Sequence, residues 1–297
     1  MKYINRLLAL LVAAVFILSL FSGFASAQAP EEQYKLHKEN YEHTKKRFEE
    51  AKGLFEKARE RLGNTNDIRS KEELKNRTRD YLLRAIDQTL SHLEILKDRV
   101  ELRENKDIIK FDASGTIEAQ ISQLEGMKVK VEQAETTQDF RAIYTELKGM
   151  WVNIRLETRY YIGIVLNYRI NNFLEKVDNV SIKMDEAITK LYSKGIDTTE
   201  LKKEADKFDS IVADARVNQQ KTDDIFEEHN GFSPDGKVTD ASAAREFLRK
   251  GDELERGTVK QIKEAAKQLK DFVREFRKLA RGKVTLDGGS TGTLSGN

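Results

Sequence analysis

Seven basic residues near the C-terminal end of the chain follow one another at steps of three or four positions. On a helix this spacing places their side chains in one line, because three to four residues make one turn. A line of cations is typical of helices that bind anionic membrane surfaces, linear polyanions or acidic proteins. The seven residues, which we call the basic stripe, are Lys260, Lys263, Lys267, Lys270, Arg274, Arg277 and Arg281.

An apolar row runs beside the basic stripe, shifted by one residue, from Val259 to Ala280. The preceding segment, 197–240, has 6 basic and 12 acidic residues, whereas 245–283 has 13 basic and 7 acidic residues. Two consecutive helices of opposite charge attract each other when they pack antiparallel. The stripe therefore has a second interpretation, as a solvated flank that faces the acidic helix.

The residue types that support catalysis or metal binding lack the required spacing. None of the four histidines belongs to an H-E-x-x-H motif, and none has Glu three residues before it, as in di-iron helical proteins. Residues 288–292 match the G-x-S-x-G pattern of hydrolases, but the expected strand and helix around it are missing. Without cysteine, thiolate catalysis and cysteine-ligated metals are excluded. We expect no enzyme activity, metal, cofactor or small-molecule substrate.

A second line of cations lies on the proline-free segment 137–194, where five of six positions at seven-residue steps are basic. An anionic polymer is one partner for such a line, and tyrosines in the same segment are able to stack on sugars. The alternative is structural, with cations on a solvated face and tyrosines in the core or an interface. The cations are Arg141, Lys148, Arg155, Arg169 and Lys176, and the tyrosines are Tyr144, Tyr160, Tyr161 and Tyr168.

Long helices must position these residues. The chain has only two prolines, Pro30 and Pro234, so the residues between them contain no helix breaker. The first segment after Pro30 has large residues at seven-residue steps, a heptad seam typical of coiled coils: Tyr34, Tyr41, Phe48, Phe55 and Leu62. Apolar spacing, caps and turns predict helices over 31–62, 70–104, 116–134, 137–194, 199–228 and 240–281.

The N-terminal residues have the pattern of a signal peptide. Lys2 and Arg6 precede an apolar run over 7–24, and the A-x-A sequence that follows predicts cleavage after Ala27. An uncleaved membrane anchor is the competing interpretation, although this run is short for a span of ~20 residues. Cleavage would leave equal numbers of acidic and basic residues, so the net charge of +2 does not favour nucleic acid as a partner. We expect an extracytoplasmic protein.

The predicted fold is all-α, an elongated bundle of five to six long helices with coiled-coil-like heptad seams. We expect a signal peptide at 1–27 and an N-terminal helical bundle with the long central helix at 28–194. A C-terminal helical hairpin at 195–281 packs on the same bundle, and a flexible glycine-rich tail follows at 282–297.

Three functions remain open at this point. The first is an exported, non-enzymatic scaffold of the cell surface or periplasm that binds protein partners or associates with itself. The second is binding of anionic lipid or a cell-surface polymer through the basic stripe, with a holdase-type chaperone as a variant. The third is an enzyme, which we rank last because no catalytic constellation is found.

Overall fold

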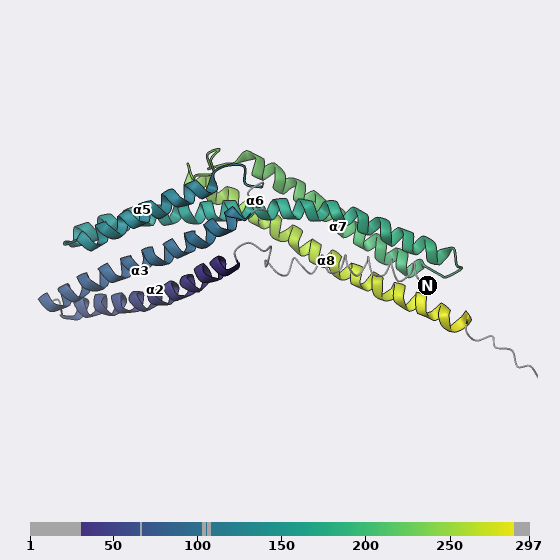
Figure 1. The fold of residues 1–297 in the computed structure, drawn as a ribbon, viewed down its shortest axis with the longest axis horizontal. Helices are drawn as coiled ribbons and strands as arrows, with labels where there is room; N and C mark the ends of the chain where they lie inside the picture. The colour runs from purple at the N-terminus through teal and green to yellow at the C-terminus, as the bar shows by residue number, and fades with distance from the viewer. Residues whose placement is uncertain (1–30, 66, 103–104, 106–107, 288–297) are drawn as a thin grey trace, which may run out of the picture. The chain divides into compact units, whose positions relative to one another are not determined.

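The computed structural model describes residues 31–65, 67–102, 105 and 108–287, with side chains for all of these except 31–32 and 281–287 (Figure 1). This part of the chain is helical and contains no β-strand, which confirms the predicted all-α class. The predicted signal peptide and the last ten residues of the predicted tail lie outside the described residues. The six described helices are α2 (Glu31–Thr65), α3 (Ile68–Glu101), α5 (Ala113–Gln133), α6 (Thr137–Tyr192), α7 (Thr199–Glu228) and α8 (Ala241–Asp287).

The observed helices begin and end close to the predicted positions. The central segment is one helix of 56 residues, α6, and α7 has the predicted bounds. Gly195 ends α6 in the left-handed conformation, with φ of 72°, and Ile196 N–H donates to Leu191 C=O at 3.2 Å. Asp197 then accepts from Thr199 N–H at 3.0 Å and so caps the start of α7. α8 continues to Asp287, into the start of the predicted tail.

The chain groups into two compact units, and α6 and α8 each contribute to both. The first, which we call the three-segment unit, contains Leu166–Glu227 and the part of α8 that begins at Lys250. The second, which we call the four-helix unit, contains the described residues up to Val165 together with Glu228–Arg249. This grouping combines pieces of the predicted segments 28–194 and 195–281, and we describe each unit by itself.

The three-segment unit has one core to which α6, α7 and α8 all contribute. Its members recur at three- and four-residue steps on each helix, which gives each segment one apolar side. The segments are also joined by polar contacts: Arg216 of α7 donates to Leu174 C=O of α6 at 2.7 Å, and Asn218 of α7 donates to Gln261 of α8 at 2.9 Å. The largest core side chains are Ile170, Phe173, Leu174, Met184 and Leu191 of α6, Leu201 and Phe208 of α7, and Ile262, Leu269, Phe272 and Phe276 of α8.

The four-helix unit packs α2 on α3, α3 on α5 and α5 on α6. In the predicted heptad seam of α2, the small residues Ala51 and Ala58 are buried, and the large ones are half-buried. Phe48 and Phe55 both lie against Tyr81 of α3, with ring centroids 5.5 and 5.2 Å away. Ion pairs cross the other helix contacts, from Lys128 of α5 to Asp87 of α3 at 2.7 Å and from Lys130 of α5 to Glu146 of α6 at 2.9 Å.

The loop between α7 and α8 folds back on itself at Gly231. The carbonyl of Gly231 accepts from Thr239 N–H at 2.9 Å and from Asp240 N–H at 3.2 Å. Its φ of 85° is a conformation that glycine adopts without strain. A Cβ at this position would lie 2.2 Å from the backbone nitrogen of Ala244. Both the backbone angle and the space therefore require glycine.

Replacing Gly231 with alanine should destabilise the protein by more than about 1 kcal/mol, because the added methyl meets backbone atoms that cannot move aside. The matched control is Gly126→Ala, in α5, where an added Cβ meets nothing within 4 Å. Alanine should stabilise that helix by ~0.5–1 kcal/mol. Urea unfolding followed by circular dichroism measures both changes, and equal stability of the two variants would contradict this account of the loop.

Candidate functional site

The basic stripe lies on the exposed side of α8. Its first six side chains are all exposed, and those of Lys260 and Arg274 retain 79% and 78% of their accessible surface. Arg281 belongs to α8, but its side chain lies outside the described residues. The apolar members of α8, which include Ile262 and Leu269, fill the core of the three-segment unit on the opposite side of the helix. The helical period thus separates one buried side from one charged side.

The ion pairs of the stripe are made within α8. Lys260 lies 3.9 Å from Glu264, and Arg274 lies 2.9 Å from Asp271. The other four cations with described side chains, Lys263, Lys267, Lys270 and Arg277, form neither an ion pair nor a hydrogen bond within the described part of the chain. The predicted attraction to the acidic helix α7 does not take the form of ion pairs with the stripe.

A row of polar residues on α8 lies between the stripe and α7. Gln261 accepts from Asn218 of α7, and Gln268 donates to Glu204 of α7. Glu264, Asp271 and Glu275 follow the same spacing of three and four residues, so they share this edge of α8. Asp209 of α7 is bonded to α6, where it accepts from Ser181 at 2.7 Å. The stripe is therefore bordered by acids on its own helix, and it faces away from α7.

The second line of cations divides between the two units. Arg141, Lys148 and Arg155 are exposed in the four-helix unit, and Lys176 is exposed in the three-segment unit. Arg169, the remaining cation of this line, is half-buried and belongs to the three-segment unit. Of the four tyrosines, Tyr160 and Tyr161 are buried, as the structural interpretation requires, whereas Tyr144 and Tyr168 keep 44% and 46% of their surface exposed.

A buried carboxylate connects α5, α6 and the α7–α8 loop in the four-helix unit. Glu157 of α6 is only 5% exposed; it accepts from Val238 N–H at 2.9 Å and from the side-chain amide of Gln120. Burial raises the pKa of Glu157 above its ordinary value, and these two hydrogen bonds oppose the shift. Both carboxylate oxygens are thus used to hold the loop. This arrangement is structural, and the sequence shows it poorly because the partners are far apart along the chain.

An aromatic cluster lies next to this carboxylate. Tyr160 stacks on Phe232 with ring centroids 4.2 Å apart, and its hydroxyl lies 2.5 Å from Nδ1 of His229. Phe111 is stacked parallel to Tyr160, with ring centroids 6.1 Å apart. Burial raises the pKa of Tyr160 to about 12, so its hydroxyl stays protonated at neutral pH. The cluster fixes the α7–α8 loop on α6.

Buried polar side chains lie on two helices of the three-segment unit, among them Glu255 of α8 and Gln219 of α7. Glu255 is 4% exposed, and its Oε1 atom has no hydrogen-bond partner among the described residues. Burial, together with the neighbouring carboxylate of Asp252, raises the pKa of Glu255 to about 8. On α7, Gln219 is also buried and donates to Asn167 and to Asp223. Because an unpaired buried carboxylate is costly, Glu255 is held in its neutral form at pH 7.

The sequence carries a signal for both positions, although neither was predicted. Glu255 interrupts a seven-residue series on α8 whose other members are apolar: Leu248, Ile262, Leu269 and Phe276. Gln219 interrupts the corresponding series on α7: Ala205, Val212 and Phe226. A polar residue within such a series predicts a buried polar group.

The remaining residues of the types that bind metals or act in catalysis do not form a common site in the described ranges. No group of three or more His, Cys, Asp or Glu residues suited to a metal ion is present in the described ranges. His37 is bonded to Asp98 at 2.7 Å, and burial lowers the pKa of His92.

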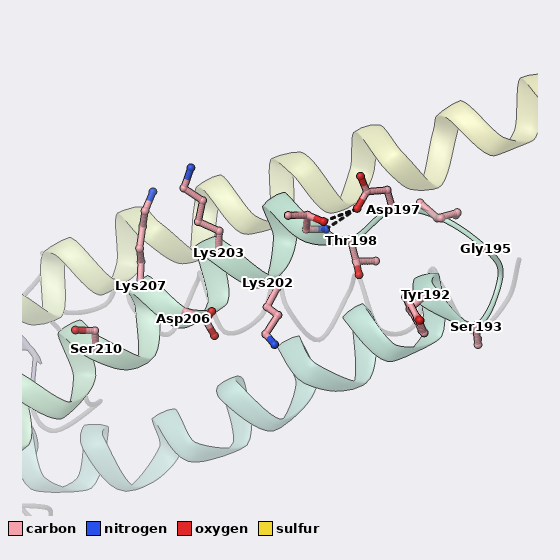
Figure 2. Close-up of a pocket in the computed structure, with 12 residues that line it drawn as sticks. Tyr192, Ser193, Gly195, Asp197, Thr198, Lys202, Lys203, Asp206, Lys207 and Ser210 are labelled. Carbon is pink, nitrogen blue, oxygen red and sulfur yellow. Dashed lines mark hydrogen bonds between the residues drawn. The ribbon is translucent and has the colours of Figure 1, made fainter.

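A surface pocket lies at the α6–α7 turn (Figure 2). Its lysines point in different directions: Lys203 and Lys207 point to one side of α7, and Lys202 points to the other. Lys203 and Lys207 each lie near an acid one turn earlier on α7. This divergence does not suit a common ligand. The lining residues are Tyr192, Ser193, Gly195, Ile196, Asp197, Thr198, Thr199, Lys202, Lys203, Asp206, Lys207 and Ser210.

Replacing Glu255 with glutamine should change how stability depends on pH. Because the folded-state pKa is raised from 4.5 to about 8, the native protein loses stability as pH rises through this range. Glutamine does not ionise, so the variant should gain stability relative to the natural protein between pH 5 and pH 8. The gain is at most about 1.4 kcal/mol for each pH unit.

Urea unfolding at pH 5, 6.5 and 8 measures this difference. The control is Glu227→Gln, at an exposed position of α7, which should give the same difference at all three pH values. Parallel stability profiles for Glu255→Gln and the natural protein would show that Glu255 is not held neutral.

No helix in the described ranges is both long and apolar enough to cross a membrane. No protein-family model matches the chain, and the searches of curated proteins and of solved structures found no similar protein.

Proposed function

We propose that this protein is a non-enzymatic, extracytoplasmic interaction protein that binds an anionic partner through the basic stripe of α8. The observation that carries the proposal is the exposure of six aligned cations on the side of α8 opposite its buried side. Four of them have no ionic partner within the described part of the chain, so their charge is available to another molecule.

The helices are the scaffold in this proposal. α6 and α8 each contribute to both compact units, and the core of the three-segment unit holds α8 by its apolar side. We further propose that the helices form an elongated bundle with coiled-coil-like seams, supported by burial of Ala51 and Ala58 between the larger residues of α2. The extracytoplasmic location is supported by the predicted signal peptide.

The buried ionisable groups support a non-enzymatic role. Glu157 uses both oxygens within the protein, and Tyr160 is bonded to His229 inside an aromatic cluster. Glu255 is enclosed in the core of its unit. A catalytic acid or base must reach a substrate, whereas these groups are covered by the surrounding side chains.

Reversing four charges of the stripe should weaken binding to anionic partners. In the variant K260E/K263E/K267E/K270E, we expect affinity for dextran sulfate and for anionic vesicles to fall at least tenfold, because attraction along the line becomes repulsion. The measurement is the dissociation constant by fluorescence anisotropy or co-sedimentation, at low and at high salt. Binding of the natural protein should weaken at high salt.

The matched control is K45E/K57E/K110E/K221E, which makes the same change in net charge at scattered, exposed lysines. It should keep most of the affinity, and circular dichroism should show that both variants are folded. Equal loss of binding in the two variants, or no binding of the natural protein to either partner, would overturn the proposal.

A further inference from the structure

We infer that the partner of the basic stripe is a linear polyanion that lies along α8, rather than a membrane into which α8 inserts. This inference depends on the proposed function and specifies its ligand. Three features of α8 lead to it: the burial of its apolar side, the positions of its aromatic residues and the acidic border of the stripe.

The apolar side of α8 is not available to a bilayer. A basic amphipathic helix binds membranes by burying its apolar side at the boundary between headgroups and acyl chains. In α8 that side is already inside the protein, where Leu269, Phe272 and Phe276 are at most 2% exposed. Insertion would require α8 to leave the core that it shares with α6 and α7. The exposed charges of α8 are therefore the groups that a partner can recognise.

The exposed side of α8 also lacks a surface on which rings stack. Its three aromatic residues, Phe247, Phe272 and Phe276, are all buried. Proteins that bind single-stranded nucleic acids combine a basic groove with exposed aromatics that stack on bases. Without such aromatics, the stripe suits a polymer that is recognised by the charges of its backbone, such as repeated phosphate or sulfate groups.

The cations form a narrow line. Successive members from Lys260 to Arg277 are three or four residues apart, which separates them by about 4.5–6 Å along the helix axis. The six cations span ~26 Å. Glu264 and Asp271 border the line on the edge toward α7. A chain that runs parallel to α8 meets cations at every step, whereas a chain that crosses α8 meets this acidic border.

The inference is tested with linear inorganic polyphosphate of increasing length. For chains with extended lengths of about 10, 25 and 50 Å, we expect affinity to rise at least tenfold from the first to the second, which spans the stripe. A smaller rise should follow from the second to the third, because the stripe is already occupied and the added length only increases the number of binding registers. Vesicles of matched anionic charge should bind more weakly than the 25 Å chain.

A composition-matched variant tests the line itself. In K263E/E264K/K270D/D271K, neighbouring residues exchange places, so two cations move from the stripe to its acidic border and the net charge is unchanged. We expect this variant to lose the rise in affinity with chain length, and circular dichroism should show an intact fold. Natural affinity in this variant would overturn the inference, because net charge alone would then be sufficient.

The outcomes separate this inference from the proposed function. If neither polyphosphate nor vesicles bind, the proposed function itself is wrong. If vesicles bind at least as tightly as polyphosphate and chain length has no effect, the proposed function stands and the linear-polymer inference is overturned.

Discussion

The separation of α8 into an apolar side and a basic side is the constraint on which the proposed function depends. The apolar side must be buried, and it is buried against α6 and α7 in a core that includes Phe208, Leu269 and Phe272. The helical period then directs the cations to the opposite side. Acids of α8 itself lie along the edge toward α7, and the cations of the stripe form no ion pair with α7. Packing, rather than charge, therefore decides where the stripe points.

The buried polar groups have a different role, because they fix how segments meet. Glu157 holds the backbone of the α7–α8 loop, and the contact between Tyr160 and His229 holds the same loop from one side. Gln219 joins α7 to α6 through Asn167. Such groups are costly when unpaired, and each pairing is possible in only one register of the segments. The raised pKa values of Glu157 and Tyr160 follow from burial, and their hydrogen bonds explain why the burial is tolerated.

Sequence patterns within a few residues predicted the helices and their bounds. Contacts between residues far apart in the chain were not predicted. The bounds of α7, the left-handed Gly195 and the exposure of the stripe follow from caps and from the helical period, which operate within a few residues. The total charges of 197–240 and 245–283 predicted an attraction between these two segments. A total charge does not tell on which side of a helix the charged residues lie, and the stripe faces away from α7. The contact between Tyr160 and His229 joins residues 69 positions apart, which no local pattern indicates. Glu255 and Gln219 were detectable as polar interruptions of apolar series.

The most direct test of the central claim is lysine reactivity measured residue by residue, using amine acetylation and mass spectrometry with and without long-chain polyphosphate. If α8 presents the stripe as described, Lys260, Lys263, Lys267 and Lys270 should react as fast as the exposed Lys45 and Lys57 in the free protein. Saturating polyphosphate should slow the four together, at least fivefold, and leave Lys45 and Lys57 unchanged. Slow labelling of the stripe in the free protein, or equal protection of all six lysines, would contradict the claim.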